Sequence, residues 1–299
     1  MINIISIGSC TPLDILSTDP QFDKKYKVLY KYQGSVSRTY YKPGSIALRL
    51  SEEKKLLKLE HSLVQLQIQS ILKEESLLSI IKTVPADTVI LVDHAYELWR
   101  YFHNGSEMFD IRASYARIAN FFPDWFNQEI KNHSKRFDEG TLSTARKQYE
   151  YINDFICQLD RLPNPVIVFG NTFTSNCYIP KTKTVGKILP MYYRSIPIGK
   201  NWFHHDDMMA YQYTEKIVQN FYKNLDKEMP DNVIRFNIDL ENVYSDPNHP
   251  NGPHPAHYHY TCRQMLLSSL NETIRQAMIP TNHLVFDSGI EPLTSTMSM

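Results

Sequence analysis

The sequence predicts an α/β protein built on a mostly parallel sheet, and two observations support this. Short apolar runs rich in β-branched residues recur along the chain, as buried strands do, at residues 2–7, 26–32, 86–93, 166–169 and 232–238. The segments between them mostly have helical spacing and are long enough for right-handed crossovers between parallel strands. We therefore expect a three-layer αβα sandwich in a single domain spanning residues 1–299, with a mainly helical insertion over the sheet edge at about 98–162.

The first strand ends in a polar turn. Four isoleucines fall within residues 2–7, Gly8 breaks the run, and Ser9 and Cys10 follow at once. A strand that ends in Gly-Ser places a hydroxyl at the carboxyl edge of the sheet, where open α/β folds bind ligands. Gly8 also lets the backbone turn sharply, so that the next N–H groups can point at an oxyanion. The competing interpretation is an ordinary turn after a first strand.

The helices follow from apolar spacing and from their boundaries. Helical patterns cover residues 51–73, 75–83, 113–133, 142–159, 206–227 and 260–277. Ser51 is a suitable N-cap with acids in the first turn, and Pro163 and Pro165 separate one helix from the strand that follows. Residues 239–255 form a long polar loop, and no internal repeat or low-complexity linker divides the chain.

Composition narrows the class of protein. Lys+Arg and Asp+Glu both number 32, whereas a general nucleic-acid binder needs a basic surplus, so we expect no nucleic-acid partner. No stretch of about 18 apolar residues predicts a transmembrane helix, and the first apolar run is too short for a signal peptide. The four cysteines are scattered without a C-x-x-C pair, which fits a reducing compartment, and we expect the cytoplasm. The oligomeric state is not indicated.

A histidine-rich stretch lies just before the last helix. Four of the eleven histidines fall within residues 249–259. One of them could act as general base for Ser9, the cluster could hold a metal, or the segment could be a surface loop without chemistry. His254-x-x-His257-x-His259 does not match the usual metal-ligand spacings, so we predict no metal site.

The chain resembles the SGNH/GDSL hydrolase superfamily at these positions. The strand followed by Gly8-Ser9-Cys10, and His257-Tyr258 ahead of the last helix, carry the resemblance. The chain resembles more closely a bacterial family of SGNH-like proteins found in capsule and surface-polysaccharide gene clusters. The stretch 246–258 resembles that family's second signature, and Asp93-x-x-x-Glu97 resembles an acidic motif in its middle. The resemblance implies an SGNH or flavodoxin-like fold over nearly the whole chain.

The resemblance also implies site roles. Ser9 would be the nucleophile, with its own N–H in the oxyanion hole, and Gly34 stands in the place of the family's oxyanion glycine. The sequence departs from the family there, because Gln33 occupies a position that is usually basic. Asn171 follows a glycine as the superfamily's oxyanion asparagine does, although its strand comes one step late.

The acidic pair at the end of the 86–93 strand has a less definite role. Asp93 and Glu97 could bind a sugar hydroxyl or pair with an arginine such as Arg38 or Arg100. A structural ion pair at the sheet edge explains them equally well.

Two histidines compete for the role of base. Asp246-Pro-Asn-His249 has the superfamily's Asp-x-x-His spacing, whereas His257 has the superfamily's position near the last helix. We favour His257. Cys10 is a rival nucleophile, since a thiolate attacks well, but an extended continuation of the strand would turn its side chain away from Ser9.

Two functions from different classes follow. The first is serine-dependent acyl transfer on oxygen, as an O-acetyltransferase or acetylesterase acting on a surface or capsular polysaccharide. No cofactor would be bound permanently, acetyl-CoA would be the donor of the transferase version, and the partners would be this donor and a carbohydrate acceptor. The alternative is a non-catalytic glycan-binding or assembly protein on a degenerate SGNH scaffold, because a fold does not guarantee its usual chemistry.

Overall fold

A five-stranded sheet organises the protein. The computed structural model describes residues 1–33, 49, 77–94, 101–104, 107–110, 122–135, 142–187, 222–227, 229–230, 233–250 and 256–279. The strands of the sheet are β1 (Ile2–Gly8), β2 (Tyr26–Gln33), β3 (Val89–Val92), β7 (Val166–Phe169) and β10 (Ile234–Phe236). Their order is β10-β7-β3-β1-β2, and every pairing between them is parallel. This confirms the predicted α/β class with a mostly parallel sheet.

The strand order creates a switch point between β1 and β3. Among these five strands the order is 2-1-3-4-5 in chain sequence, so the chain leaves β1 toward one side of the sheet and later returns to the other. Open α/β sheets bind ligands at such a point, outside the carboxyl ends of the strands. Ser9 and Cys10 follow β1, and Asp93 and His94 follow β3.

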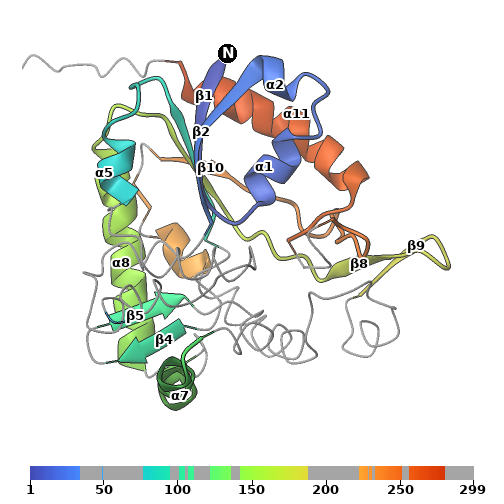
Figure 1. The fold of residues 1–299 in the computed structure, drawn as a ribbon. Coiled ribbons are helices and arrows are strands. Elements are labelled where there is room, and N and C mark those ends of the chain that lie inside the picture. The colour runs from blue at the N-terminus through green and yellow to red at the C-terminus, as the bar shows by residue number, and fades with distance from the viewer. Residues whose placement is uncertain are drawn as a thin grey trace, which may run out of the picture.

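Helices cover both faces of this sheet. The helices α1 (Thr11–Leu16) and α11 (Tyr260–Ala277) lie on one side, and α5 (Leu77–Ile81) and α8 (Leu142–Asp160) lie on the other (Figure 1). Each face has its own buried apolar cluster. In β3, Ile90 and Val92 belong to one cluster and Val89 and Leu91 to the other. A strand that is buried on both faces has a continuous run of apolar residues, and this run made β3 predictable from the sequence.

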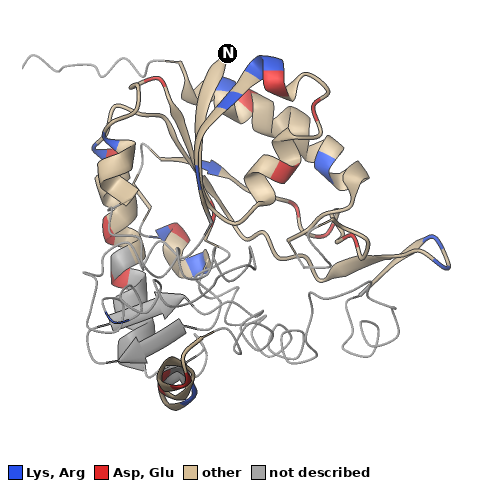
Figure 2. Ribbon diagram, in the orientation of Figure 1, with Lys and Arg blue, Asp and Glu red and all other residues tan. Residues whose placement is uncertain are grey.

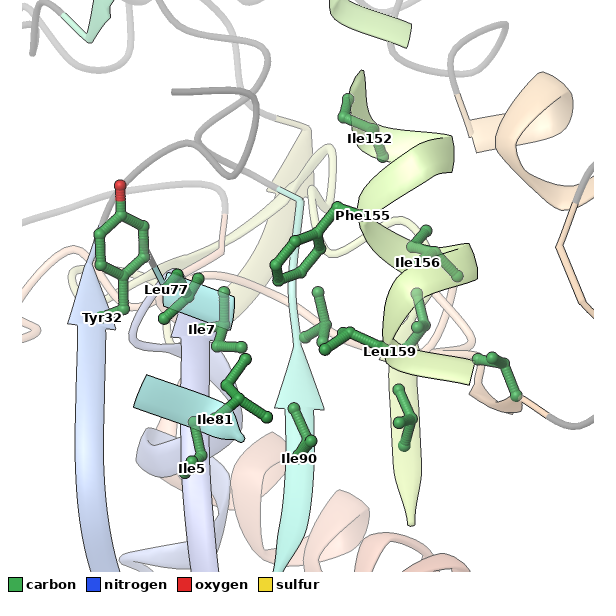
Figure 3. Close-up of a cluster of buried hydrophobic side chains, with 14 of the residues drawn as sticks. Ile5, Ile7, Tyr32, Leu77, Ile81, Ile90, Ile152, Phe155, Ile156 and Leu159 are labelled. Atoms are coloured by element: carbon green, nitrogen blue, oxygen red, sulfur yellow. The ribbon is translucent and has the colours of Figure 1, made fainter. Parts of the chain in front are cut away.

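The cluster under α8 ties the longest described helix to the sheet. Phe155, Ile156 and Leu159 of α8 are fully buried against side chains from β1 and β3 (Figure 3). Burying a side chain of this size contributes about 1.5–3 kcal/mol. The region expected to be a mainly helical insertion therefore supplies part of the domain core.

That same region also contains strands that the sequence analysis did not predict. A small antiparallel sheet joins β4 (Tyr101–Asn104), β5 (Glu107–Asp110) and β6 (Ser134–Lys135), next to α7 (Asp124–His133). These strands have two to four residues, too few to show an alternating pattern. The other short elements are α2 (Phe22–Lys25) and the hairpin of β8 (Asn176–Ile179) and β9 (Thr184–Lys187).

Several predicted elements fall wholly or partly outside the described residues. The helix expected at 51–73 lies outside them, and of the helices expected at 113–133 and 206–227 the structure describes only the later parts, which are helical. None of the described helices is long and apolar enough to cross a membrane. Acidic and basic residues are interspersed along the described elements (Figure 2).

Candidate active site at the carboxyl edge of the sheet

Gly8 fixes the geometry of the turn after β1. Its φ is +104°, and a Cβ added to it would lie 1.7 Å from the backbone carbonyl oxygen of Asp93. No other residue type fits both the backbone conformation and this approach. The glycine therefore lets the ends of β1 and β3 meet, with Ser9 and Cys10 at the switch point.

The Ser9 hydroxyl is held by the strand end next to it. It donates a hydrogen bond to Asp93 Oδ2 and lies 2.9 Å from Thr11 Oγ1. The Thr11 N–H donates to Ser9 Oγ at 3.1 Å, and Thr11 Oγ1 donates to the Ala256 carbonyl at 3.3 Å. These contacts fix the Ser9 side chain on the Asp93 side of the turn.

Cys10 faces the opposite way, toward the histidine-rich loop. Its Sγ lies 3.2 Å from His257 Nε2. The premise of an extended continuation after β1 is wrong, because Cys10 is already the N-cap of α1 and Pro12 stands in the first turn of that helix. Burial raises the pKa of the Cys10 thiol well above its ordinary value, and the negative charges of Asp14 and Asp93 raise it further. The resting side chain is therefore a neutral thiol.

Asp14 and His249 complete the surroundings of Cys10. Asp14 lies one helical turn after Cys10, and its N–H donates to the Cys10 carbonyl at 2.9 Å. His249 stacks on His257 with ring centroids 4.3 Å apart, and its Nε2 lies 3.6 Å from Asp14 Oδ2. Desolvation, with smaller effects of His257 and Arg263, lowers the pKa of His249 to about 3. His249 is therefore neutral at pH 7, and its contact with Asp14 is not an ion pair.

Backbone hydrogen bonds hold His257 in place. The Asp246 N–H donates to the His257 carbonyl at 2.8 Å, and the His259 N–H donates to the Tyr244 carbonyl at 3.0 Å. Between these two histidines, the fully buried Tyr258 donates its hydroxyl to the Thr172 carbonyl at 2.5 Å. The short segment around His257 is thus pinned to the core, which gives its imidazole a defined direction.

The other residues predicted for the site lie in different surroundings. Asp246 Oδ1 accepts from the Asn248 N–H at 2.8 Å, so this carboxylate caps a local turn and His249 has Asp14 beside it instead. Asn171 Oδ1 accepts from the Phe173 N–H at 2.9 Å, also within a turn. The predicted Gly34 and Glu97, together with Arg38 and Arg100, lie outside the described residues.

His94 is a buried histidine directly after Asp93. It is fully buried, and neither ring nitrogen has a hydrogen-bond partner among the described residues. Desolvation lowers the pKa of His94 to about 3, so the imidazole is neutral at pH 7.

Sequence reasoning missed two residues of this site, Thr11 and Asp14. The Thr-Pro pair after Cys10 is a helix start signal, and Asp14 follows Cys10 at i+4. A helix predicted from Thr11 would have placed Asp14 next to the thiol.

The scan of the sequence against protein-family models finds no match, and the search of curated proteins finds no significant match.

The arrangement has the parts that nucleophilic catalysis needs. A thiol lies within hydrogen-bond reach of an imidazole, and a serine hydroxyl accompanies it on the same turn. The described contacts pair His257 with Cys10, whereas the sequence analysis had paired it with Ser9.

Proposed function

We propose that this protein catalyses acyl transfer through a covalent acyl-enzyme on Cys10, with His257 as the general base. The distance of 3.2 Å between Cys10 Sγ and His257 Nε2 carries the proposal. A nucleophile and a base at this separation, at the carboxyl edge of a parallel sheet, form a common catalytic arrangement.

The neutral state of the thiol defines the first step. As Cys10 Sγ attacks the acyl carbonyl carbon, His257 Nε2 takes the thiol proton and then gives it to the leaving group. In the second step, an acceptor hydroxyl passes its proton to His257 while its oxygen attacks the thioester. The S–C bond breaks, and the proton returns from His257 to the sulfur. General base catalysis of this kind contributes about 10²–10⁴ in rate.

Ser9 takes a supporting role in this proposal. Its hydroxyl is bound to Asp93, so it is not aimed at His257 in the described contacts. Ser9 and Asp93 instead stiffen the turn that presents Cys10.

The resemblance to SGNH-like proteins gives the proposal its finer form. Helices on both faces of the sheet and the 2-1-3-4-5 strand order support a three-layer SGNH-like scaffold. On that basis the acceptor is a hydroxyl of a surface or capsular polysaccharide and the donor is an acyl thioester such as acetyl-CoA. None of the four cysteines forms a disulfide in the structure, and a reducing, cytoplasmic location is part of this proposal.

The test is covalent labelling with an activated acetyl ester, followed by intact-protein mass. Wild type is compared with Cys10→Ala, Ser9→Ala and, as a matched control, Cys157→Ala on α8. We expect one acetyl adduct in wild type, Ser9→Ala and Cys157→Ala, and none in Cys10→Ala.

Two results would contradict the proposal. An adduct that disappears in Ser9→Ala and remains in Cys10→Ala makes Ser9 the nucleophile, as the sequence analysis expected. No adduct in any variant, with native circular dichroism, favours the non-catalytic glycan-binding role.

A further inference from the structure

Three metal-ligating side chains converge beside the first turn of α1. Ligand atoms of Cys10, Asp14 and His257 all lie within 4.8 Å of one another. Two come from the start of the chain and the third from just before α11. Thiolate, carboxylate and imidazole are the three ligand types that Zn²⁺ takes in proteins.

The spacing of these atoms suits a metal of that size. Zn–S bonds of about 2.3 Å and Zn–N bonds of about 2.0–2.1 Å at a tetrahedral angle place sulfur and nitrogen roughly 3.5 Å apart. Cys10 Sγ and His257 Nε2 are 3.2 Å apart, so this edge of the tetrahedron is nearly formed.

The Asp14 carboxylate supports the same site. Its side chain interacts with the Cys10 thiol, while its buried Oδ2 oxygen makes no close hydrogen bond among the described residues. Because a buried oxygen is poorly solvated, a cation bound between the carboxylate and the sulfur would satisfy it. His249 Nε2, 3.6 Å from this oxygen, lies where it can orient the carboxylate.

We propose that Cys10, Asp14 and His257 form a binding site for a divalent transition metal, best suited to Zn²⁺. The three protein ligands leave a fourth position for water, as in open zinc sites. Binding forms the S–Zn bond and releases the thiol proton to solvent. We expected no metal from the sequence because only ligands close together in the histidine-rich stretch were compared, whereas His257 lies more than 240 residues after Cys10 and Asp14.

The site would also regulate the activity proposed above, and this consequence rests on that proposed function. A thiolate bound to Zn²⁺ cannot attack an acyl carbonyl, so metal and acyl group compete for Cys10. Zinc would therefore hold the enzyme in a reversible inactive state.

Binding is tested without any substrate, by titrating chelator-treated protein with Co²⁺. Thiolate coordination gives a charge-transfer band in the near ultraviolet, and Zn²⁺ should displace the Co²⁺ and abolish the band. We expect one Co²⁺ per chain in wild type and in the control Cys157→Ala. The band should disappear in Cys10→Ala, and Asp14→Asn should raise the Kd for Co²⁺ at least about tenfold.

A second measurement separates metal binding from catalysis. Stoichiometric Zn²⁺ should protect Cys10 from acetyl labelling, and a chelator should restore it. The Co²⁺ band without any acetyl labelling supports the metal site and removes only the catalytic proposal. If folded protein shows Cys10-dependent acetyl labelling but no Co²⁺ band, the metal site is overturned and the catalytic proposal stands. A Co²⁺ band that survives in Cys10→Ala also overturns the metal site.

Discussion

Ser9 and Cys10 are neighbours in sequence with nearly equal burial, 6% and 5% exposed, yet they have different chemical surroundings. Ser9 faces Asp93 and Thr11, which hold its hydroxyl in a closed set of hydrogen bonds. Cys10 faces His257. Asp14 lies close to both of these side chains, and His249 stacks on the His257 ring. Burial alone thus does not separate the two candidate nucleophiles; their partners do.

The difference originates in one turn. Because the chain stops being extended at Gly8 and becomes helical at Thr11, two consecutive side chains point to opposite walls of the switch point. The Ser9 wall is made by the end of β3 and by Thr11, and the Cys10 wall by Asp14 of α1 and the histidine loop. Two neighbouring side chains thus have a carboxylate as one partner and an imidazole as the other, and only the imidazole can serve as the base of the proposed reaction.

The largest expected effect comes from removing the turn itself. Gly8→Ala would place a Cβ 1.7 Å from the Asp93 carbonyl oxygen at a φ of +104°, so β1 and β3 must separate. We expect a loss of more than about 4 kcal/mol in free energy of unfolding, measured by urea denaturation. Gly186→Ala is the control, because its Cβ would meet the side chain of Ile179, whose movable Cδ1 end lies 2.8 Å away, and no backbone atom lies near it among the described residues. Equal losses in the two variants would show that Gly8 does not set the turn.

The next effect tests the contact between Cys10 and His257. His257→Ala should slow acetyl labelling by about 10²–10⁴, because the neutral thiol loses its proton acceptor. His259→Ala is the matched control, since His259 caps α11 through the Thr261 N–H and has no described contact with Cys10. That control should cost stability, about 1 kcal/mol, but not the labelling rate. A slower rate in both variants alike would point to the loop and not to the base.

The third effect concerns the buried His94, which follows Asp93 in the chain, and depends on pH. The pKa of His94 is about 3 in the folded protein and about 6.5 when unfolded. The unfolded chain therefore binds a proton between these values that the folded chain does not, so stability is complete above about pH 6.5 and falls as pH drops toward 3. The loss attributable to His94 is on the order of 5 kcal/mol.

His94→Leu tests that attribution. Urea denaturation at several pH values should give a flatter dependence between pH 6.5 and 3 in the variant than in wild type. Parallel curves would mean that His94 does not remain neutral in the folded protein.

The smallest effect loosens the support of His257. Tyr258→Phe removes the hydroxyl that donates to the Thr172 carbonyl at 2.5 Å, and should cost about 1–3 kcal/mol of stability. Tyr260→Phe, at an exposed position on α11, should change stability by less than about 0.5 kcal/mol. Thermal or urea denaturation measures the stability of both variants. Equal losses would show that the Tyr258 hydroxyl does not hold the segment around His257.

The sequence predicted the sheet better than the site. The apolar runs of β1, β3 and β7 and the helices α8 and α11 have strong local patterns, so their positions were confirmed. The short strands β4–β6 were missed because they are recognisable only by their pairing with one another, and they carry no pattern of their own in the sequence.

In the site, the histidine loop was predicted to meet the polar turn after β1 through Ser9, whereas the described contacts pair His257 with Cys10. Which side chain of the turn faces His257 depends on the helix that starts at Thr11. Asp14 was missed for the same reason, because only that helix brings it beside Cys10. Spacing along the chain carries no information on contacts between its two ends.

The most direct test of the central claim is to identify the residue that carries the acyl group in wild-type protein. The protein is trapped with an activated acetyl ester, digested and sequenced by tandem mass spectrometry, with and without neutral hydroxylamine. We expect acetyl on Cys10, as a thioester that neutral hydroxylamine removes. Acetyl on Ser9, as an oxygen ester that survives this treatment, would contradict this expectation.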